Sequence, residues 1–429
     1  MTDFGRSDDP GVQAQLDRLR ALSLPQGRLG LDTIRALCER LGNPQDRLPP
    51  VFHVAGTNGK GSVCAFLRAM LEADGKRVHV ATSPHLVRYN ERIRIGDELI
   101  DDASLAALLA EVLDAADAAE LAPSFFEVTI AASFLAFARH PADACVVEVG
   151  LGGRFDATNV IAKPAMCAIA ALGLDHERFL LAPEDGTPAE PAARIAFEKA
   201  GIAKSGVPLV TLGYPEAATL EIERAALRGG ASLAMEGRDW HVVMEDTLHY
   251  RDRHGELALP LPTMPGSHQV RNAGLAIAML RHQDGVSASP AAMAEGLRSA
   301  RWPARLQRLA DGPLTQGRTV WLDGAHNRDA ADAIARFFAG RPLHLIAGMI
   351  TSKDPEALLG PLVPLARSVT VVPVAGQDHH PPAAFGDVQS AGSVDDAIAA
   401  LPDDGLPVLI AGSLYLAGDV LRANGEIPD

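Results

Sequence analysis

The sequence predicts an α/β protein with a mostly parallel sheet. Short apolar runs alternate with longer amphipathic or Ala/Leu-rich segments, which is the pattern of successive β–α units. A chain of 429 residues is longer than one hydrophobic core usually serves, so at least two domains are expected. We place the first over residues 1–299 and the second over residues 300–429, with no internal repeat.

The first domain should contain five core strands and the helices between them. The expected strands are 51–55, 78–81, 145–149, 166–170 and 209–212, and the expected helices are 62–73, 102–118, 126–138 and 192–200. Over residues 231–261 the residue pattern changes to short strands separated by turns, which indicates a small antiparallel section. Helices at 268–280 and near 291–299 should follow it.

A second alternating series begins after a linker at residues 300–309, which contains Pro303. Its strands are expected at 319–323, 343–347, 369–373 and 408–411, with helices between them. The sequence therefore predicts a second, smaller α/β domain.

Composition and charge exclude several classes of function. The chain is 47% hydrophobic and 22% charged, as globular proteins are, and its formal net charge is −15. Such an excess of negative charge argues against nucleic acid or an anionic membrane as the main partner. No apolar run approaches the roughly 20 residues that span a bilayer, and the polar start of the chain does not resemble a signal peptide. We therefore expect a cytoplasmic protein.

The four cysteines are far apart in the sequence, and three of them lie in apolar stretches. We expect reduced, packed thiols at all four, and neither a disulfide nor a zinc site. The four are Cys38, Cys64, Cys145 and Cys167. Two adjacent histidines, His379 and His380, precede two prolines in a polar loop, and we expect both to be exposed.

A Gly-rich turn joins the first expected strand to the first helix in the segment VFHVAGTNGKGS, residues 51–62. Glycines allow the backbone to approach phosphate oxygens, N–H groups at the helix start point at the anion, and Lys60 adds a positive charge. The segment departs from the generic ATPase pattern, because Val54 replaces its first glycine and Gly61 separates Lys60 from Ser62. A tight strand–helix connection is the alternative reading. The predicted nucleotide-binding residues are Gly56, Thr57, Asn58, Gly59, Lys60, Gly61 and Ser62.

Polar residues follow several expected strands where parallel sheets place ligands. The Gly-rich loop, Ser83, Glu148 and His176 all lie at such carboxyl ends. Glu148 is the most informative, because an unpaired carboxylate inside the apolar run CVVEV would cost several kcal/mol. A structural salt bridge or a magnesium ligand beside phosphate would explain it.

The compact loop GTNGKGS resembles that of the Mur ligase and folylpolyglutamate synthase superfamily. Further segments resemble folylpolyglutamate and dihydrofolate synthases and occur in the expected order between Gly27 and Leu421. They are TSPHLVRYNER (82–92), FFE (125–127), EVGLGGRFDATN (148–159), GLDH (173–176), IAFEKAGI (195–202), RLQ (305–307), DGAHN (323–327), GMITSKD (348–354) and GSLY (412–415). The resemblance implies a P-loop-containing, Mur-ligase-like domain followed by a smaller Rossmann-like α/β domain.

The same resemblance extends the nucleotide site into both domains. It implies that Asn272 lies near the adenine or ribose, that Arg305 reaches the phosphates and that Asp323 binds the ribose. In the order of the motifs, His326 and Lys353 also fall close to this nucleotide site. The alternative interpretation of His326 is a helix cap, and that of Lys353 is a surface lysine.

Metal ligands and a modified lysine are also implied by the resemblance. Ser83 and Glu148 would hold one magnesium ion beside the nucleotide, and Glu148 and His176 would hold a second nearer the acyl substrate. Lys199, which from the residues alone would be a solvated lysine, would be carbamylated. The implied catalytic groups are thus Lys60, Glu148, His176 and Lys199.

The resemblance also implies a pterin or folate pocket lined by two short segments. These are Ser124, Phe125, Phe126 and Glu127 in the first, and Arg154, Phe155, Asp156 and Ala157 in the second. Phe125 and Phe126 are candidate aromatic walls, although such pairs at helix starts are more often core residues. Arg154 has charge suited to substrate carboxylates, and Asp156 to pterin nitrogens. Residues 182–190 are a Pro/Glu-rich insertion relative to the familiar pattern, which should lengthen a surface loop.

The implied function is an ATP-dependent ligase that adds L-glutamate to dihydropteroate and to reduced folates through an acyl phosphate, giving ADP and phosphate. A folylpolyglutamate synthase without the first activity, another Mur-type amide ligase and a nucleotide-binding protein without catalysis are the alternatives. The expected partners are small molecules, ATP and magnesium, with no nucleic acid or membrane, and the family's habit suggests a monomer.

Overall fold

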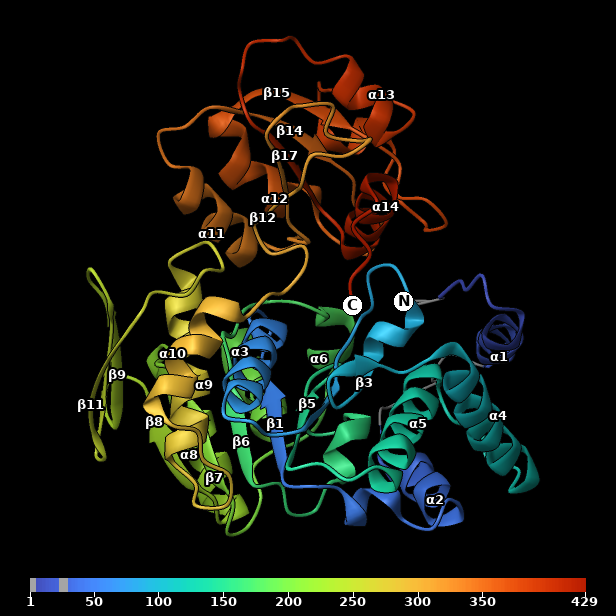
Figure 1. Cartoon of the computed structure of the whole chain (residues 1–429), viewed down its shortest axis with the longest axis vertical. Helices are drawn as coiled ribbons and strands as arrows, with labels where there is room; N and C mark the ends of the chain where they lie inside the picture. The colour runs from blue at the N-terminus through green and yellow to red at the C-terminus, as the bar shows by residue number, and fades with distance from the viewer. Residues whose placement is uncertain (1–4, 23–29) are drawn as a thin grey trace.

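The computed structural model describes residues 5–22 and 30–429. Gly27, where the resemblance begins, lies outside the described residues. Two sheets with their helices lie one above the other, and the chain passes from the lower to the upper near residue 300 (Figure 1). None of the helices in the described part is long and apolar enough to cross a membrane.

The N-terminal sheet has eight strands in the order β4-β3-β2-β5-β1-β6-β7-β8. The six strands from β2 to β8 in this order are parallel, and β3 and β4 add an antiparallel edge. The bounds are β1 Val51–Ala55, β2 Val78–Ala81, β3 Ile93–Ile95, β4 Glu98–Leu99, β5 Ala144–Glu148, β6 Met166–Ile169, β7 Pro208–Thr211 and β8 Ser232–Met235.

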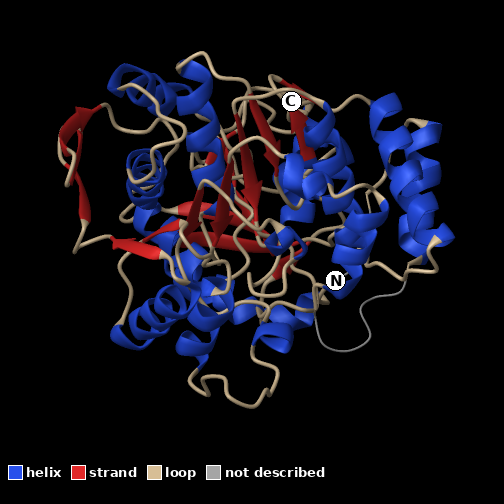
Figure 2. Ribbon diagram, turned by 90° about the horizontal axis from the view of Figure 1, so that it is seen from below, coloured by secondary structure: helices blue, strands red, loops and turns tan. Residues whose placement is uncertain are grey.

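Helices cover both faces of this sheet (Figure 2), so its central strands are apolar throughout. One face packs against α3, α9 and α10, and the other against α1, α2, α4, α5, α7 and α8. The bounds are α1 Pro10–Ala21, α2 Asp32–Arg40, α3 Lys60–Ala73, α4 Asp102–Ala118, α5 Phe125–Arg139, α6 Glu177–Leu180, α7 Pro191–Ala200, α8 Glu216–Gly229, α9 His268–Arg281 and α10 Pro290–Ser299.

Three strands form a separate antiparallel sheet in the order β11-β10-β9, from β9 Trp240–Met244, β10 Leu248–Asp252 and β11 Gly255–Leu259. This sheet confirms the antiparallel section expected from residues 231–261. The start of that section behaves differently, because β8 pairs in parallel with β7 and extends the main sheet.

The C-terminal sheet has six strands in the order β12-β13-β17-β14-β15-β16, parallel except for β12. Its strands are β12 Gln307–Arg308, β13 Val320–Leu322, β14 Leu343–Ala347, β15 Ala366–Val371, β16 Gln389–Ser390 and β17 Val408–Ala411. Its helices are α11 Arg328–Phe338, α12 Pro355–Leu362, α13 Val394–Ala399 and α14 Leu414–Asn424. The predicted second α/β series is thus present.

The four cysteines are free and buried, as expected. The expectation for the histidine pair was wrong, because His379 and His380 are half-buried. Each ring makes a hydrogen-bond contact with a carbonyl oxygen: His379 Nδ1 lies 3.0 Å from that of Gln377, and His380 Nε2 lies 2.7 Å from that of Lys353.

Candidate active site between the two sheets

The Gly-rich loop leaves β1 at Ala55 and enters α3 at Lys60. Gly59 has a φ of +85°, which favours glycine, and a Cβ there would lie 2.5 Å from Oδ1 of Asn272. Asn272 is buried in α9 and donates to Gln269, and Gln269 in turn donates to the hydroxyl of Ser62 at 3.3 Å. The loop is therefore held against α9, with its helix N-terminus available to an anion.

Lys60 and Glu148 face each other at the carboxyl ends of β1 and β5. Lys60 Nζ lies 3.9 Å from Oε1 of Glu148, and the backbone N–H of Ser83 donates to Oε2 of Glu148 at 3.2 Å. Burial raises the pKa of Glu148, and the charge of Lys60 opposes that rise. The charges of Arg305 and Arg92 also act against the rise, but burial outweighs all three cations, so the carboxylate is suited to a further positive charge.

His176 lies beyond the end of β6 at the start of α6, with a φ of +52°. The loop before it is joined to the Gly-rich loop, because the Thr57 hydroxyl donates to the carbonyl oxygen of Gly173 at 2.9 Å. Burial lowers the pKa of His176 to about 3, so its ring is neutral at pH 7. A neutral imidazole is the form that binds metals.

Lys199 is buried near the end of α7, which corrects the interpretation of a solvated lysine. Its Nζ donates to the carbonyl oxygen of Gly56 at 2.9 Å. Burial, followed by repulsion from Lys60, lowers the pKa of Lys199 to about 7. A substantial fraction of this amine is therefore neutral at physiological pH.

Asp323 and Arg305 lie together on the C-terminal sheet's side of the site. Asp323 is buried and accepts hydrogen bonds from the backbone N–H groups of Leu306 at 2.7 Å and Ala325 at 2.8 Å. Burial raises the pKa of Asp323, and the nearby charge of Arg305 opposes that rise. Ala304 and Leu306, on either side of Arg305, have φ values of +54° and +44°, so the linker backbone turns sharply at this arginine.

Three polar side chains meet between the two sheets. Asp175, next to His176, pairs with Lys353 and lies 3.3 Å from Nε2 of His326. Burial acts to raise the pKa of Asp175, but the hydrogen bond from His326 and the neighbouring positive charges outweigh it and hold that pKa below its ordinary value. The contact brings both candidate residues of the second series, His326 and Lys353, beside the loop that carries His176.

Sequence reasoning did not select several residues that shape the site. Asn58 and Asn327 exchange amide hydrogen bonds of 3.2 and 3.1 Å across the two sheets. Trp302 lies against the loop, since a Cβ on Gly61 would be 2.4 Å from its Nε1. Asp175 could have been found from its place at a strand end, but the partners of Asn58 and Gly61 lie more than 200 positions away and carry no local signal.

The predicted pterin segments lie close together. A Cβ on Gly150, after β5, would lie 2.3 Å from Cζ of Phe126, so the start of α5 touches that loop. Phe125, Phe126 and Phe155 are all half-buried. Ser124 and Glu127 form a reciprocal cap of α5, with the Ser124 N–H donating to Glu127 Oε2 at 2.7 Å.

Two polar residues of the second segment, Asp156 and Arg154, already make hydrogen bonds or ion pairs within the protein. Asp156 is buried and accepts hydrogen bonds from the N–H groups of Leu151 and Thr158 at 2.8 and 3.0 Å. Arg154 differs from the expected substrate contact, because its guanidinium is paired with Glu184 and Glu198.

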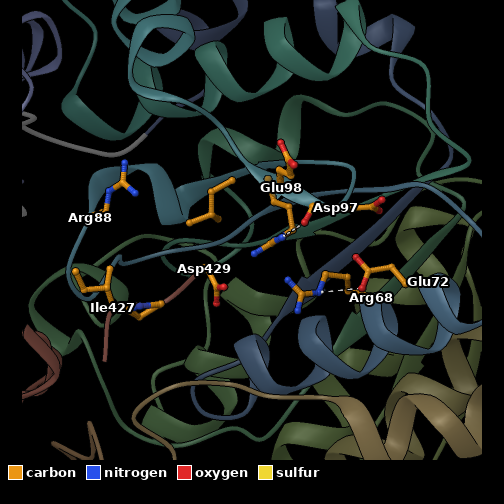
Figure 3. Close-up of a pocket in the computed structure, with 10 residues that line it drawn as sticks. Arg68, Glu72, Arg88, Asp97, Glu98, Ile427 and Asp429 are labelled. Carbon is orange, nitrogen blue, oxygen red and sulfur yellow. Dashed lines mark hydrogen bonds and ion pairs between the residues drawn. The ribbon is translucent and has the colours of Figure 1, made fainter. Parts of the chain in front are cut away.

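A cavity of about 830 Å³ lies elsewhere, beside the second half of α3 and the β3–β4 turn (Figure 3). Arg68, Arg88 and Arg94 line it together with Glu72, Asp97, Glu98 and Asp429. It contains none of the predicted site residues, and acidic groups outnumber the three arginines. In the described residues, no group of three or more His, Cys, Asp or Glu side chains is placed so that it could hold a metal ion.

No family model matches the chain. Comparison with individual proteins is decisive: the chain is 35% identical to the folylpolyglutamate synthase of Lacticaseibacillus casei over 416 residues, which are 90% of this chain and 92% of that protein. The chain belongs to the dihydrofolate synthase/folylpolyglutamate synthase family. It is also 33% identical to the dihydrofolate synthase/folylpolyglutamate synthase of Bacillus subtilis, over 92% of this chain and 94% of that protein.

Solved structures of the dihydrofolate synthase/folylpolyglutamate synthase family have the same fold. Escherichia coli FolC in complex with DHPP and ADP matches with a TM-score of 0.85 and 31% identity, covering 97% of each chain. A bifunctional folylpolyglutamate synthase/dihydrofolate synthase with Mn, AMPPNP and L-glutamate bound matches with a TM-score of 0.83 and 29% identity, over 98% of this chain and 99% of that one. The predicted fold class and family are confirmed, and with them membership of the acid–amino-acid ligases.

Proposed function

We propose that this chain is an ATP-dependent ligase that joins L-glutamate to dihydropteroate, forming dihydrofolate, and also to reduced folates, extending a γ-glutamyl tail. The observation that carries the proposal is that Lys60 faces Glu148 at the Gly-rich loop, while Asp175, next to His176, contacts Lys353 and His326 of the second α/β unit. The Bacillus subtilis relative, which is named for both activities, aligns over 92% of the chain.

ATP would bind with its phosphates on the loop from Gly56 to Ser62 and with its nucleoside between the two units. The free N–H groups at the start of α3 and the charge of Lys60 support the phosphate assignment. Asn272 lies against the loop, and Arg305 and Asp323 lie at the linker, which supports their proposed contacts with the nucleotide. Two units meeting over the nucleotide would exclude water from a reactive anhydride.

Magnesium fits the donor set at the end of β5. The buried Glu148 carboxylate beside Ser83 is a hard oxygen ligand, and ATP phosphates and water would complete the shell. The neutral ring of His176 supports a second site, and the ions would neutralise phosphoryl charge. We propose Ser83, Glu148 and His176 as the ligands from this chain.

Lys199 is proposed to be carbamylated. The ammonium group of Lys199 would first lose one proton. The neutral amine would then attack carbon dioxide, forming an N–C bond and releasing a second proton, so that a buried cation becomes an anion. Support comes from its burial and from its pKa of about 7, because only the neutral amine is a nucleophile. The new carboxylate would offset the positive charge of Lys60 and the metal region.

The reaction would proceed by transfer of the γ-phosphoryl group of ATP to the acyl substrate's carboxylate. Lys60 and Arg305 would stabilise charge on the phosphoryl oxygens. The glutamate amine then attacks the acyl carbon, and phosphate leaves as the C–N bond forms. Phe125, Phe126, Phe155 and Ala157 would line the pterin side, because their half-buried or buried side chains converge where α5 meets the β5 loop.

The deciding assay measures ADP release with glutamate and either dihydropteroate or a reduced folate. We expect release with both acceptors in the wild type and a loss of about 100-fold or more in Lys60→Ala. Lys163→Ala, which removes an exposed lysine, should behave as the wild type. Release with the reduced folate alone would restrict the chain to folylpolyglutamate synthesis, and release only with a uridine-linked acceptor would indicate a Mur-type ligase. Near-normal turnover in Lys60→Ala would contradict the assignment.

We propose that the chain acts as a cytoplasmic monomer made of two domains, 1–299 and 300–429. The two sheets, each with its own buried core clusters, support this division. Limited proteolysis should cut near residue 300 before it cuts within either sheet, and a mass measurement in solution tests the monomer.

A further inference from the structure

Four charged side chains near Lys199 form a compact, largely buried cluster. Its members are Arg154, Glu184, Arg194 and Glu198. Arg154 contacts Glu198 through Nε at 3.0 Å and Nη2 at 2.7 Å, and it contacts Glu184 through Nη1 at 2.9 Å. Arg194 Nη2 lies 3.0 Å from Glu198 and 3.2 Å from Glu184. Each guanidinium thus contacts both carboxylates, and the two positive charges balance the two negative ones.

The cluster joins three separate segments of the proposed site. Arg154 comes from the loop after β5, Glu184 from the segment that follows His176, and Arg194 and Glu198 from α7, which carries Lys199. Arg194 Nε also donates to the carbonyl oxygen of Leu180 at 3.0 Å, which fixes the end of α6. Because α6 begins directly after His176, this bond ties the loop that carries His176, which is the proposed metal loop, to α7.

Close backbone contacts also hold the loop after β5 against the end of α7. The N–H of Arg154 donates to the carbonyl oxygen of Glu198 at 2.8 Å, and a Cβ on Gly153 would lie 2.8 Å from the carbonyl oxygen of Lys199. The Arg154 guanidinium also lies 4.9 Å from the centre of the Phe197 ring. A displacement of Arg154 would therefore move the last turn of α7 and the amine of Lys199 with it.

We propose that Arg154 and Glu184 are positioning residues, which hold the β5 loop, His176 and Lys199 in one arrangement for metal binding and catalysis. The inference rests on the proposed function for the identity of the metal ligands. Glu184 is 14% exposed although it belongs to the exposed, Pro/Glu-rich segment 182–190. Through Glu184, that segment thus makes a buried contact with the two arginines, in addition to lengthening a surface loop.

The test compares Glu184→Gln with the wild type, using Mn²⁺ as the metal probe. The amide keeps the shape of the side chain but leaves the two arginines facing one carboxylate. We expect the Kd for Mn²⁺ to rise about tenfold and kcat to fall about tenfold, as is typical when a partner of a metal-site residue is lost. KM for ATP should change less than kcat, because Lys199 and its bond to Gly56 stand between the cluster and the Gly-rich loop. Glu184→Asp should recover part of both losses.

Glu111→Gln is the matched control, because it breaks a bidentate pair with Arg139 on the outside of the same unit, where both side chains are 44–47% exposed. It should leave Mn²⁺ affinity and kcat as in the wild type. If Glu184→Gln does not fold, Arg154→Lys, which keeps the charge but loses the planar fork, is measured in the same way.

A lower thermal midpoint with unchanged Mn²⁺ affinity and kcat would overturn the inference, because the cluster would then serve stability alone. Failure of the proposed function has a different signature. In that case the wild type itself would release no ADP with glutamate and either acceptor, while the Mn²⁺ comparison would still decide whether the cluster positions the metal loop.

Discussion

Lys199 donates a hydrogen bond of 2.9 Å to the carbonyl oxygen of Gly56, so a buried amine supports the first residue of the phosphate loop from below. The two residues lie 143 positions apart in the chain. The bond joins the end of α7 to the end of β1 and explains why an amine in an Ala-rich helix is 4% exposed.

The pH dependence of stability should report this burial. The pKa of Lys199 is lowered from 10.5 to about 7, so its contribution to stability is present in full above the unfolded pKa and is lost as pH falls through the folded one. In buffer free of carbon dioxide, Lys199→Met should therefore be more stable than the wild type by roughly 1–4 kcal/mol near pH 6, and this gain should shrink toward about pH 9. Chemical denaturation at the two pH values measures it. A gain that does not change with pH would show that the amine is not titrating in this range.

Gly59→Ala should damage the phosphate loop in two ways. Its φ of +85° is unfavourable for alanine, and the new Cβ would meet Asn272. We expect a loss of about 1–3 kcal/mol in stability and a large loss of ATP affinity, measured by denaturation and calorimetry. Gly75→Ala is the control, because Gly75 has a φ of +77° with open space around it. Equal ATP binding by both variants would contradict the loop assignment.

Glu148→Gln should separate metal binding from folding. Replacing a buried carboxylate by its isosteric amide removes the desolvation that raises the pKa of Glu148, so the folded protein should be as stable as the wild type or more so without metal. Mn²⁺ affinity and ADP release should each fall by about two orders of magnitude. Electron paramagnetic resonance titration and the ADP assay give the two values, and unchanged Mn²⁺ affinity would remove Glu148 from the ligand set.

Asp175→Asn should weaken the contact between the two α/β units. Loss of its pairing with Lys353 and His326 should cost the closed arrangement about 2 kcal/mol, and kcat should fall about tenfold or more as a result. Small-angle scattering with bound ATP analogue would show a larger radius than in the wild type. Asp404→Asn, which disturbs a contact with His344 inside one unit, should change neither quantity.

The sequence determined the main elements and the local chemistry. β1, β2, β14, β17 and α4 have the expected bounds, because apolar strands buried on both faces and alternating with amphipathic helices have a strong local pattern. The Gly-rich loop could also be recognised from the sequence, because a strand, a Gly-rich turn and a helix that begins with lysine follow one another within a few residues. Glu148 could be recognised because a carboxylate is unusual inside an apolar strand.

Short edge strands such as β3, β4 and β16 were not predicted, because two or three residues carry no periodicity and their pairing depends on neighbouring strands. The partners of long polar side chains were equally inaccessible. Arg154 was assigned to a substrate carboxylate from its charge alone, and only folding brought Glu184 and Glu198 to its guanidinium.

Local patterns thus determined which residues could serve phosphate and metal chemistry. The tertiary structure alone decided that Lys199 is buried, that Asp175 meets Lys353 and that Arg154 is paired. Those outcomes depend on contacts between segments tens to hundreds of residues apart, where desolvation and pairing act on a side chain whose own sequence neighbours give no sign of them.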